Sequence, residues 1–273
     1  MILRILNAIT NPYFAVYAAA KRYILKYEGF SYSFQKNGEE HLLDALSDSG
    51  VKTVFDVGAN IGGWTEIAIL KFKDANVHSF EISKTTFKSL QKKHVNNTRI
   101  FLNNFGLSDK KGQIEYKDYG ENSGVNSLIM DANFHDQHIS PTLVSAVVET
   151  GNDYCKKKKI GEIDFLKIDV EGAEHLVLRG FSDLLENSAI KVIQFEYGYT
   201  HADARFLIKD FYKLLEKYGY LLGPLKPNGV IFMDFEYALN DFNSGPNYVA
   251  VHKSCNAIIE KIRGKPIKGY PRR

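Results

Sequence analysis

Short apolar runs alternate with helical stripes from residue 51 onward. Apolar residues at helical spacing predict helices over 64–72, 87–94, 173–186 and 207–218. The runs predict strands over 51–57, 76–80, 99–102, 163–170 and 190–195. The run at 163–170 is almost continuous, as in a strand buried on both faces. This alternation is typical of a doubly wound, mostly parallel α/β sheet, which binds ligands beyond the carboxyl ends of its strands.

The remaining segments are expected to extend or flank this sheet. Residues 113–117 and 145–148 are predicted to be short strands, the latter at an edge, with the polar stretch 118–140 as a loop between them. Residues 229–233 and 248–252 are expected to form an antiparallel pair that closes the sheet. We therefore expect an N-terminal helical cap (1–50), a main domain (51–253) and a basic tail (254–273).

The two ends of the chain each allow two interpretations. The aromatic-rich start predicts helices over 13–25 and 41–49, either packed on the main domain or, through residues 1–30, in peripheral contact with a membrane. It lacks the ordered regions of a secretory signal, so we expect it in the mature protein. The tail is expected to be solvated, with contact to an acidic lipid or polyanion as the alternative. Its basic residues are Lys261, Arg263, Lys265, Lys268, Arg272 and Arg273.

Composition excludes several classes of protein. Of 273 residues, 44% are hydrophobic and 25% are charged, which excludes a mainly disordered chain. The net charge of +3 is too small to indicate a nucleic-acid partner. Cys155 and Cys255 form no CxxC pair, so we expect no zinc site or disulfide framework, and a reducing, cytoplasmic setting fits best. No apolar run reaches the roughly 18 residues that span a membrane.

A glycine-rich turn follows the first predicted strand. Gly58 and Gly62 leave room for a ligand to approach the backbone, and Asp56 and Asn60 supply polar groups. Asn60 stands where a dinucleotide fingerprint needs its second glycine, and no Gly-Lys-Ser/Thr follows, so neither that fingerprint nor a P-loop is present. An acidic loop of this kind suits a ligand with an ammonium group, such as S-adenosylmethionine.

Polar residues also follow the second and third strands. Glu81 lies 25 residues after Asp56, near the spacing at which an acidic residue accepts hydrogen bonds from ribose hydroxyls. The alternative for Glu81 is a charge at the N-terminus of the next helix. Asn104 is a candidate to bind an adenine edge with Phe105 stacked on the ring, and a simple turn is the alternative.

The densest functional signal ends the fourth long strand. Lys167, Asp169 and Glu171 alternate there, and two carboxylates so close repel each other unless a cation or a proton lies between them. We expect Asp169 or Glu171 to contact cofactor or substrate, with helix capping as the alternative. A divalent cation is the less favoured solution, and no residue is assigned as a metal ligand.

Glu196 and His201 follow the fifth strand and are candidates for a catalytic base. The alternative for His201 is an exposed loop residue that caps the next helix.

These motifs together resemble the FkbM-type family of S-adenosylmethionine-dependent methyltransferases. The matching pieces span about residues 51–200, and the Lys-Ile-Asp-Val-Glu-Gly-Ala-Glu string is the most specific of them. They are Phe55–Gly62, Phe80-Glu81, Asn104–Asp109, Asn126-Ser-Leu128, Phe165–Glu174 and Leu178-Arg-Gly180. One departure is Ile82, where family members often carry proline, so the loop under the adenosine is expected to be less rigid.

The resemblance implies a class I methyltransferase fold and O-methylation of hydroxyl groups, often on sugars or other natural products. It implies that Asp56, Gly58 and Asn60 line the cofactor, that Glu81 holds its ribose, and that Asp169 and Glu171 lie at the reaction centre. We therefore expect an O-methyltransferase acting on a small-molecule or glycan hydroxyl, with Glu196, Asp169 or His201 as base. The alternatives are an inactive nucleotide-binding or scaffold module of the same fold and, disfavoured by Asn60, an NAD-dependent oxidoreductase.

Overall fold

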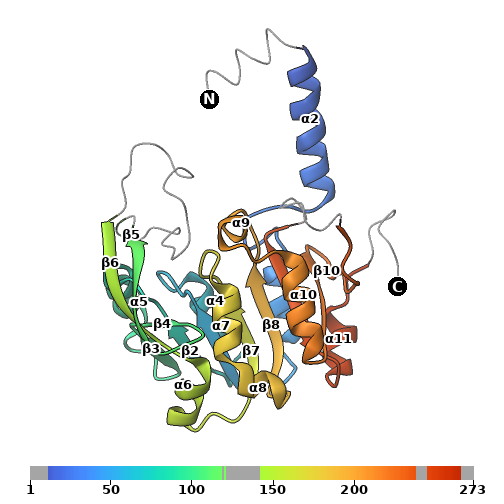
Figure 1. Ribbon diagram of the computed structural model, residues 1–273. Helices are drawn as coiled ribbons and strands as arrows, with labels where there is room; N and C mark the ends of the chain where they lie inside the picture. The colour runs from blue at the N-terminus through green and yellow to red at the C-terminus, as the bar shows by residue number, and fades with distance from the viewer. Residues whose placement is uncertain (1–11, 119, 121–141, 238–244, 266–273) are drawn as a thin grey trace.

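An eight-stranded sheet forms the centre of the molecule (Figure 1), seen here in a computed structural model that describes residues 12–118, 120, 142–237 and 245–265. The strand order is β10-β9-β11-β8-β7-β1-β2-β3. The strands are β1 (Thr53–Val57), β2 (Asn76–Phe80), β3 (Ile100–Asn103), β7 (Ile163–Ile168), β8 (Ile190–Glu196), β9 (Tyr220–Lys226), β10 (Gly229–Val230) and β11 (Asn247–His252). Strands β3, β2, β1, β7 and β8 pair in parallel, so the expected doubly wound sheet is confirmed.

The closing pair of strands differs from the prediction. Strand β11 lies between β8 and β9 and is antiparallel to both, whereas β10 pairs with β9. Strand β9 was not expected, because Gly223 and Pro224 interrupt its apolar run as they would in a turn.

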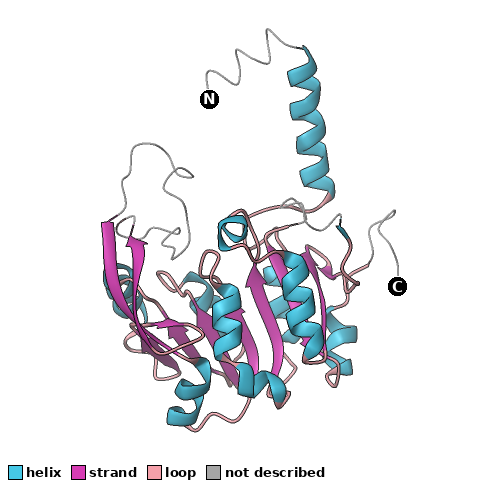
Figure 2. Ribbon diagram, in the orientation of Figure 1, coloured by secondary structure: helices cyan, strands magenta, loops and turns pink. Residues whose placement is uncertain are grey.

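Helices cover both faces of the sheet (Figure 2). On one face, α6 (Gly151–Lys158), α7 (Glu174–Gly180), α8 (Ser182–Glu186) and α10 (Ile208–Lys217) pack on Phe55, Leu166 and Ile193. On the other, α3 (Glu39–Leu46), α4 (Gly63–Lys71) and α11 (Asn256–Ile262) pack on Val54, Phe165 and Val192. Adjacent strand residues thus supply opposite cores, which is why these strands are apolar without alternation. Helices α5 (Lys84–His94) and α9 (Thr200–Ala204) complete the set.

A second, three-stranded sheet lies beside β3. It consists of β4 (Gly106–Leu107), β6 (Thr142–Glu149) and β5 (Gly112–Asp118), in that order. Strand β6 was expected at an edge, but it is the central strand, parallel to β4 and antiparallel to β5. Residue 119 and residues 121–141, which carry most of the predicted loop, lie outside the described residues.

The two helices of the N-terminal segment have different surroundings. Helix α2 (Pro12–Tyr27) projects away from the sheet (Figure 1), and Tyr13, Tyr17 and Tyr23 on it are exposed. Of the two interpretations of this segment, packing on the main domain does not match the exposed side chains of this helix. Helix α3 instead contributes buried leucines to the main core. Within the described residues, no helix combines the length and apolarity needed to cross a membrane, and peripheral contact by residues 1–30 stays a prediction.

Two further expectations need correction. The tail is not simply solvated, because α11 buries Ile259 and Ile262 against the core; residues 266–273 lie outside the described part. The single helix predicted over 173–186 is two helices, α7 and α8, that meet at Phe181. At the junction a Cβ on Gly180 would lie 2.1 Å from the Ser108 carbonyl oxygen, so the backbones touch there.

Candidate active site

Two cavities open at the carboxyl ends of the central strands. The chain leaves β1 toward β2 and β3 on one side and continues through β7 and β8 on the other, so strand order reverses between β1 and β7. The first cavity is lined by Val57, Gly58, Asn60, Phe80, Glu81, Ile82, Gly106, Leu107, Tyr116, Val148, Asp169, Val170, Glu171 and Ala173. The second cavity includes Tyr32, Phe34, Trp64, Lys167, Asp169 and Glu196. Asp169 lines both, so the two cavities adjoin at this residue.

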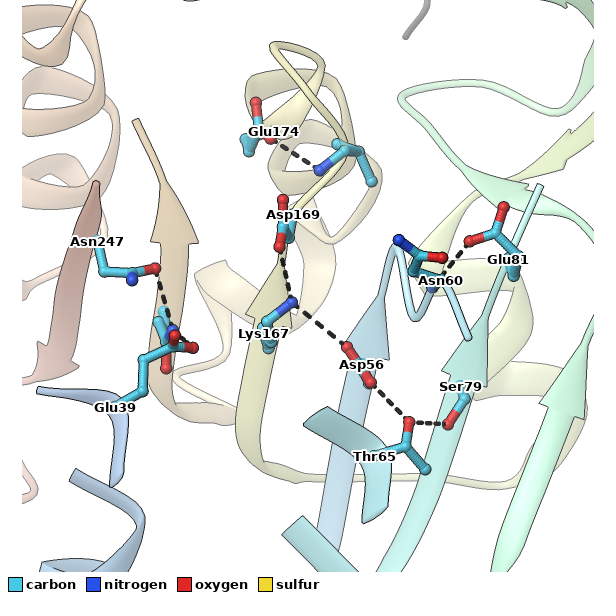
Figure 3. A network of polar contacts seen from close by, with 12 residues as sticks. Glu39, Asp56, Asn60, Thr65, Ser79, Glu81, Lys167, Asp169, Glu174 and Asn247 are labelled. Atoms are coloured by element: carbon cyan, nitrogen blue, oxygen red, sulfur yellow. Dashed lines mark hydrogen bonds and ion pairs between the residues drawn. The ribbon is translucent and has the colours of Figure 1, made fainter. Parts of the chain in front are cut away.

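Asp56 lies beneath the cavities instead of lining either one. Its carboxylate is fully buried, accepts a 2.6 Å hydrogen bond from Thr65 Oγ1, and lies 3.6 Å from Lys167 Nζ (Figure 3). Burial raises the pKa of Asp56, while the Lys167 charge and the Thr65 hydrogen bond oppose that rise. Asp56 therefore supports Lys167 and the start of α4, and the structure does not bring it to the wall of the first cavity.

The two glycines of the turn are required by contacts within the protein. Gly58 has φ of +84°, and a Cβ on it would lie 1.8 Å from the Asp169 carbonyl oxygen. Gly62 has φ of +79°, and its Cβ would meet His94 and Leu90 within 2.6 Å. Gly58 still lines the first cavity, whereas Gly62 does not. The expected reason for these glycines, room for a ligand, is therefore secondary to the close approach of β1 to β7 and of α4 to α5.

Glu81 forms a fixed carboxylate at the wall of the first cavity. One of its oxygens accepts the Asn60 N–H at 2.9 Å (Figure 3), and the other accepts the Ser83 N–H at 2.8 Å. Burial raises the pKa of Glu81 to about 7, although both backbone hydrogen bonds favour the charged form. Ser83 also caps α5, so the loop after Glu81 is held without the proline that the family often has.

Asn104 and Phe105 stand next to the cavity without lining it. The Asn104 amide donates a 2.9 Å hydrogen bond to the Glu81 carbonyl oxygen, and the Phe105 ring packs edge-on against Phe80. Their contacts therefore match the turn interpretation. The apolar side chains of this region that do line the cavity are Ile82 and Leu107.

Glu174 holds the loop that follows β7. Its two oxygens accept the backbone N–H groups of Val170 at 2.8 Å and Gly172 at 2.9 Å, and Glu171 between them has a φ of 56°. Figure 3 shows Glu174 at this loop, directly beyond Asp169. His201 Nε2 lies 2.8 Å from Glu174 Oε2, and His201 Nδ1 accepts the Gly198 N–H at 3.2 Å. His201 is buried and lines neither cavity. This position matches neither the catalytic base nor the exposed capping residue considered for it. His201 instead supports Glu174 behind the loop.

Three carboxyl groups gather where the cavities meet. Burial and then the nearby Asp169 charge raise the pKa of Glu171 to about 8, and they raise the pKa of Glu196 well above its usual range. Lys167 Nζ lies 3.0 Å from Asp169 Oδ2, and burial lowers its pKa less than the charges of Asp169, Asp56 and Glu39 raise it. The cation and protons that such a cluster requires thus come from Lys167, Glu171 and Glu196. Among the described residues, no group of three or more His, Cys, Asp or Glu side chains could hold a metal ion.

The raised pKa of Glu171 makes stability depend on pH. The folded protein holds this proton up to about pH 8 and the unfolded chain only to about 4.5, so the wild type loses stability as pH rises between these values. Glu171→Gln is expected to be more stable than the wild type by about 1–3 kcal/mol at pH 9 and equally stable at pH 4. Urea denaturation at both pH values measures this, with the exposed Glu115→Gln as control. A Glu171→Gln effect that is equal at both pH values would contradict the assignment.

Several lining residues carry no signal in the sequence. Tyr116 and Val148 reach the first cavity from the second sheet, and Tyr32 and Phe34 reach the second cavity from the segment before α3. All four lie on segments far from the glycine-rich turn in the chain, so only the folded structure brings them there.

The chain resembles known methyltransferases in sequence. The sequence profile described as the methyltransferase FkbM domain matches residues 56–222. The hexuronic acid methyltransferase AglP of Haloferax volcanii is 27% identical over 179 residues, which are 63% of this chain and 69% of that protein. Among solved structures, methyltransferase FkbM from Methylobacillus flagellatus is 16% identical with a TM-score of 0.42, and the match covers 74% of this chain and 44% of that chain. A TehB-like SAM-dependent methyltransferase from Corynebacterium glutamicum is 15% identical with a TM-score of 0.39, over 88% of this chain and 98% of the other.

Proposed function

Because the chain belongs to the FkbM-domain family of methyltransferases, we propose that it transfers a methyl group from S-adenosylmethionine to a hydroxyl group of a sugar, glycan or related natural product. The methyltransferase activity itself follows from the family. The cofactor, the hydroxyl target and the residue roles are our proposal. The observation that carries it is the first cavity, where a carboxylate fixed by two backbone N–H groups stands beside an apolar wall.

The residues of the first cavity fit this cofactor. Each Glu81 oxygen keeps a free lone pair for a ribose hydroxyl after accepting one backbone N–H. Asn60 Oδ1 is buried without a hydrogen-bond partner in the described part of the chain, so it is an acceptor that a ligand amine would satisfy. Ile82 and Leu107 supply the apolar surface that an adenine ring needs.

Asp169 is the residue we assign as general base. S-adenosylmethionine, when bound, supplies an already activated methyl group, so the protein mainly aligns the hydroxyl and removes its proton. Asp169 lines both cavities, and its carboxyl group pairs with Lys167 Nζ at 3.0 Å. Glu196 keeps its own proton and hydrogen-bonds to Asp169, so it positions the base instead of replacing it. Glu171 stands on the cofactor side of the same junction.

Loss of the Glu81 carboxylate is expected to weaken cofactor binding by at least about 10-fold, since each charge-assisted hydrogen bond is worth about 1.5–3 kcal/mol. Calorimetry with S-adenosylmethionine compares the wild type with Glu81→Ala, and circular dichroism verifies that the variant is folded. The control is Glu162→Ala, an exposed carboxylate that pairs with Lys191 and lines neither cavity. Undiminished binding in a folded Glu81→Ala variant would remove the proposed cofactor site.

The alternative of an inactive module of the same fold predicts cofactor binding without turnover. Methyl release into a panel of glycans, followed with radiolabelled cofactor, separates the two. We expect turnover that is lost in Asp169→Asn. Cofactor binding with no transfer to any member of the panel would favour the inactive module.

A further inference from the structure

The second cavity has no role assigned by the family or by the cofactor. It lies on the other side of Asp169 from the first cavity, between the segment 32–39, the start of α4 and the ends of β7, β8 and β11. A group bound there would therefore lie next to Asp169, the residue that also lines the cofactor cavity.

Aromatic rings form part of its wall. Tyr32 is 69% exposed, Phe34 packs partly against the core, and Trp64 is only 9% exposed. An exposed ring such as that of Tyr32 can stack on the apolar face of a sugar ring and leave the sugar hydroxyls free to make hydrogen bonds. The Trp64 ring itself packs against Phe165 and lies beside Lys167 Nζ.

The polar groups of the cavity offer both donors and acceptors. Trp64 Nε1–H is a buried donor without an acceptor among the described residues, which points to a ligand oxygen. Glu39 (Figure 3) is buried, and its carboxyl oxygens accept hydrogen bonds from the Asn37 amide at 2.6 Å and the Gln194 amide at 2.7 Å. A sugar hydroxyl both donates and accepts, so it satisfies the indole and the carboxylates at once.

Charge limits what else can bind. The lining has one ammonium group, Lys167, and it is already shared between Asp56 and Asp169. The other ionisable groups of the described lining are the Tyr32 phenol and the carboxyl groups of Glu39, Glu66, Glu196 and Asp169. Lys93 lies at the rim of the cavity, and its ammonium group is already paired with the Glu66 carboxylate. Glu196 holds its proton, but a ligand carboxylate would still face the acidic side chains of Glu39 and Asp169, and the described part of the wall offers it no cation that is not already paired.

We propose that the second cavity is the acceptor site and that it binds an uncharged, hydroxyl-rich sugar ring in preference to a sugar acid. The inference rests on the proposed function and separates this chain from its relative AglP, whose name refers to hexuronic acid. A hydroxyl of the neutral ring then stands beside Asp169, and Tyr32 and Trp64 select the ring.

Trp64 provides the readout, because it is the only tryptophan in the 273-residue chain. The full chain, with S-adenosylhomocysteine present, is titrated with methyl glycosides of glucose, galactose and mannose and with the matching methyl glycuronides. We expect at least one neutral glycoside to change Trp64 emission saturably and its glycuronide to bind at least about 10-fold more weakly. A glycuronide that binds as well or better, or no response to any neutral glycoside, would overturn the proposal.

Two variants locate the response. Tyr32→Ala is expected to weaken the neutral glycoside at least about 5-fold without changing S-adenosylhomocysteine affinity by calorimetry. Tyr23→Ala, an equally exposed tyrosine on α2 that lines neither cavity, is expected to change neither. Equal glycoside affinity in Tyr32→Ala and Tyr23→Ala would place the sugar elsewhere. If S-adenosylhomocysteine itself fails to bind the wild type, the proposed function fails; if it binds and the glycosides do not, only the acceptor site fails.

Quenching of Trp64 tests the charge of the cavity without any sugar. Iodide, an anion, is expected to quench less than neutral acrylamide and cationic caesium, relative to free tryptophan. Iodide quenching equal to that of caesium would contradict a cavity that disfavours sugar acids.

Discussion

Lys167→Met is expected to lower the free energy of unfolding by about 3–5 kcal/mol, measured by urea denaturation at pH 7. Methionine keeps most of the volume but leaves Asp56, which is fully buried, without a counter-charge. It also removes the ammonium beside Asp169, so methyl transfer should fall along with stability. This is the largest single-site effect that we expect from the polar network beneath the cavities.

The matched control is Lys191→Met on the neighbouring strand β8. Lys191 also pairs with two carboxylates, Glu162 and Asp164, but its side chain is 32% exposed, so its loss is expected to cost under about 1 kcal/mol. Adding Asp56→Asn to Lys167→Met should recover part of the lost stability, because it removes the uncompensated charge. Equal losses in Lys167→Met and Lys191→Met, or no recovery in the double variant, would show that Lys167 does not compensate Asp56.

Gly58→Ala is expected to destabilise the protein by at least about 3 kcal/mol and to abolish cofactor binding, measured by thermal unfolding and calorimetry. A side chain there meets two obstacles, the left-handed φ of +84° and the Asp169 carbonyl oxygen 1.8 Å from the added Cβ. Relief requires β1 and β7 to separate at their carboxyl ends. That movement would displace Asp169 from the junction of the two cavities.

Gly63→Ala, five residues further along, separates this clash from a general effect of adding a methyl group. Nothing lies within 4 Å of a Cβ on Gly63, and it begins α4 with ordinary backbone angles. We expect its stability to change by less than about 0.5 kcal/mol, or to rise slightly, since alanine favours helices. A Gly58→Ala variant as stable as Gly63→Ala would mean that β1 and β7 tolerate separation.

The sequence predicts the strand ends well for a physical reason. Strands β1, β2 and β7 are buried along nearly their whole length, so their apolar runs stop sharply where the chain emerges at a polar residue. Glu81 and Asp169 were predicted to meet at one edge, and both line the first cavity. Asp56 lies inside β1, one residue before the strand ends, and not beyond its carboxyl end. Its side chain is therefore buried and accepts a hydrogen bond from Thr65.

Other features depend on contacts between distant segments. Strand β9 was missed because Gly223 and Pro224 suggest a turn. A Cβ on Gly223 would lie 2.0 Å from the Ile231 carbonyl oxygen, so glycine is needed there because the two backbones approach closely. His201 was predicted to be a catalytic base or, as the alternative, an exposed loop residue that caps the next helix. In the folded chain it lies among Tyr197 and Phe211, which no local pattern reveals.

The segment that joins α2 to α3 is held at both ends by Lys226, the last residue of β9. Lys226, 1% exposed at its side chain, donates to the Glu28 carbonyl oxygen at 2.7 Å and to its carboxylate at 2.8 Å. Ten residues later, a Cβ on Gly38 would lie 2.3 Å from the Lys226 carbonyl oxygen. Tyr32 and Phe34 therefore lie on a segment that is anchored to strand β9 of the sheet and not to the protruding helix α2. Removing the residues before Glu28 should leave these anchoring contacts in place. A truncated chain therefore separates any role of α2 from recognition of the acceptor.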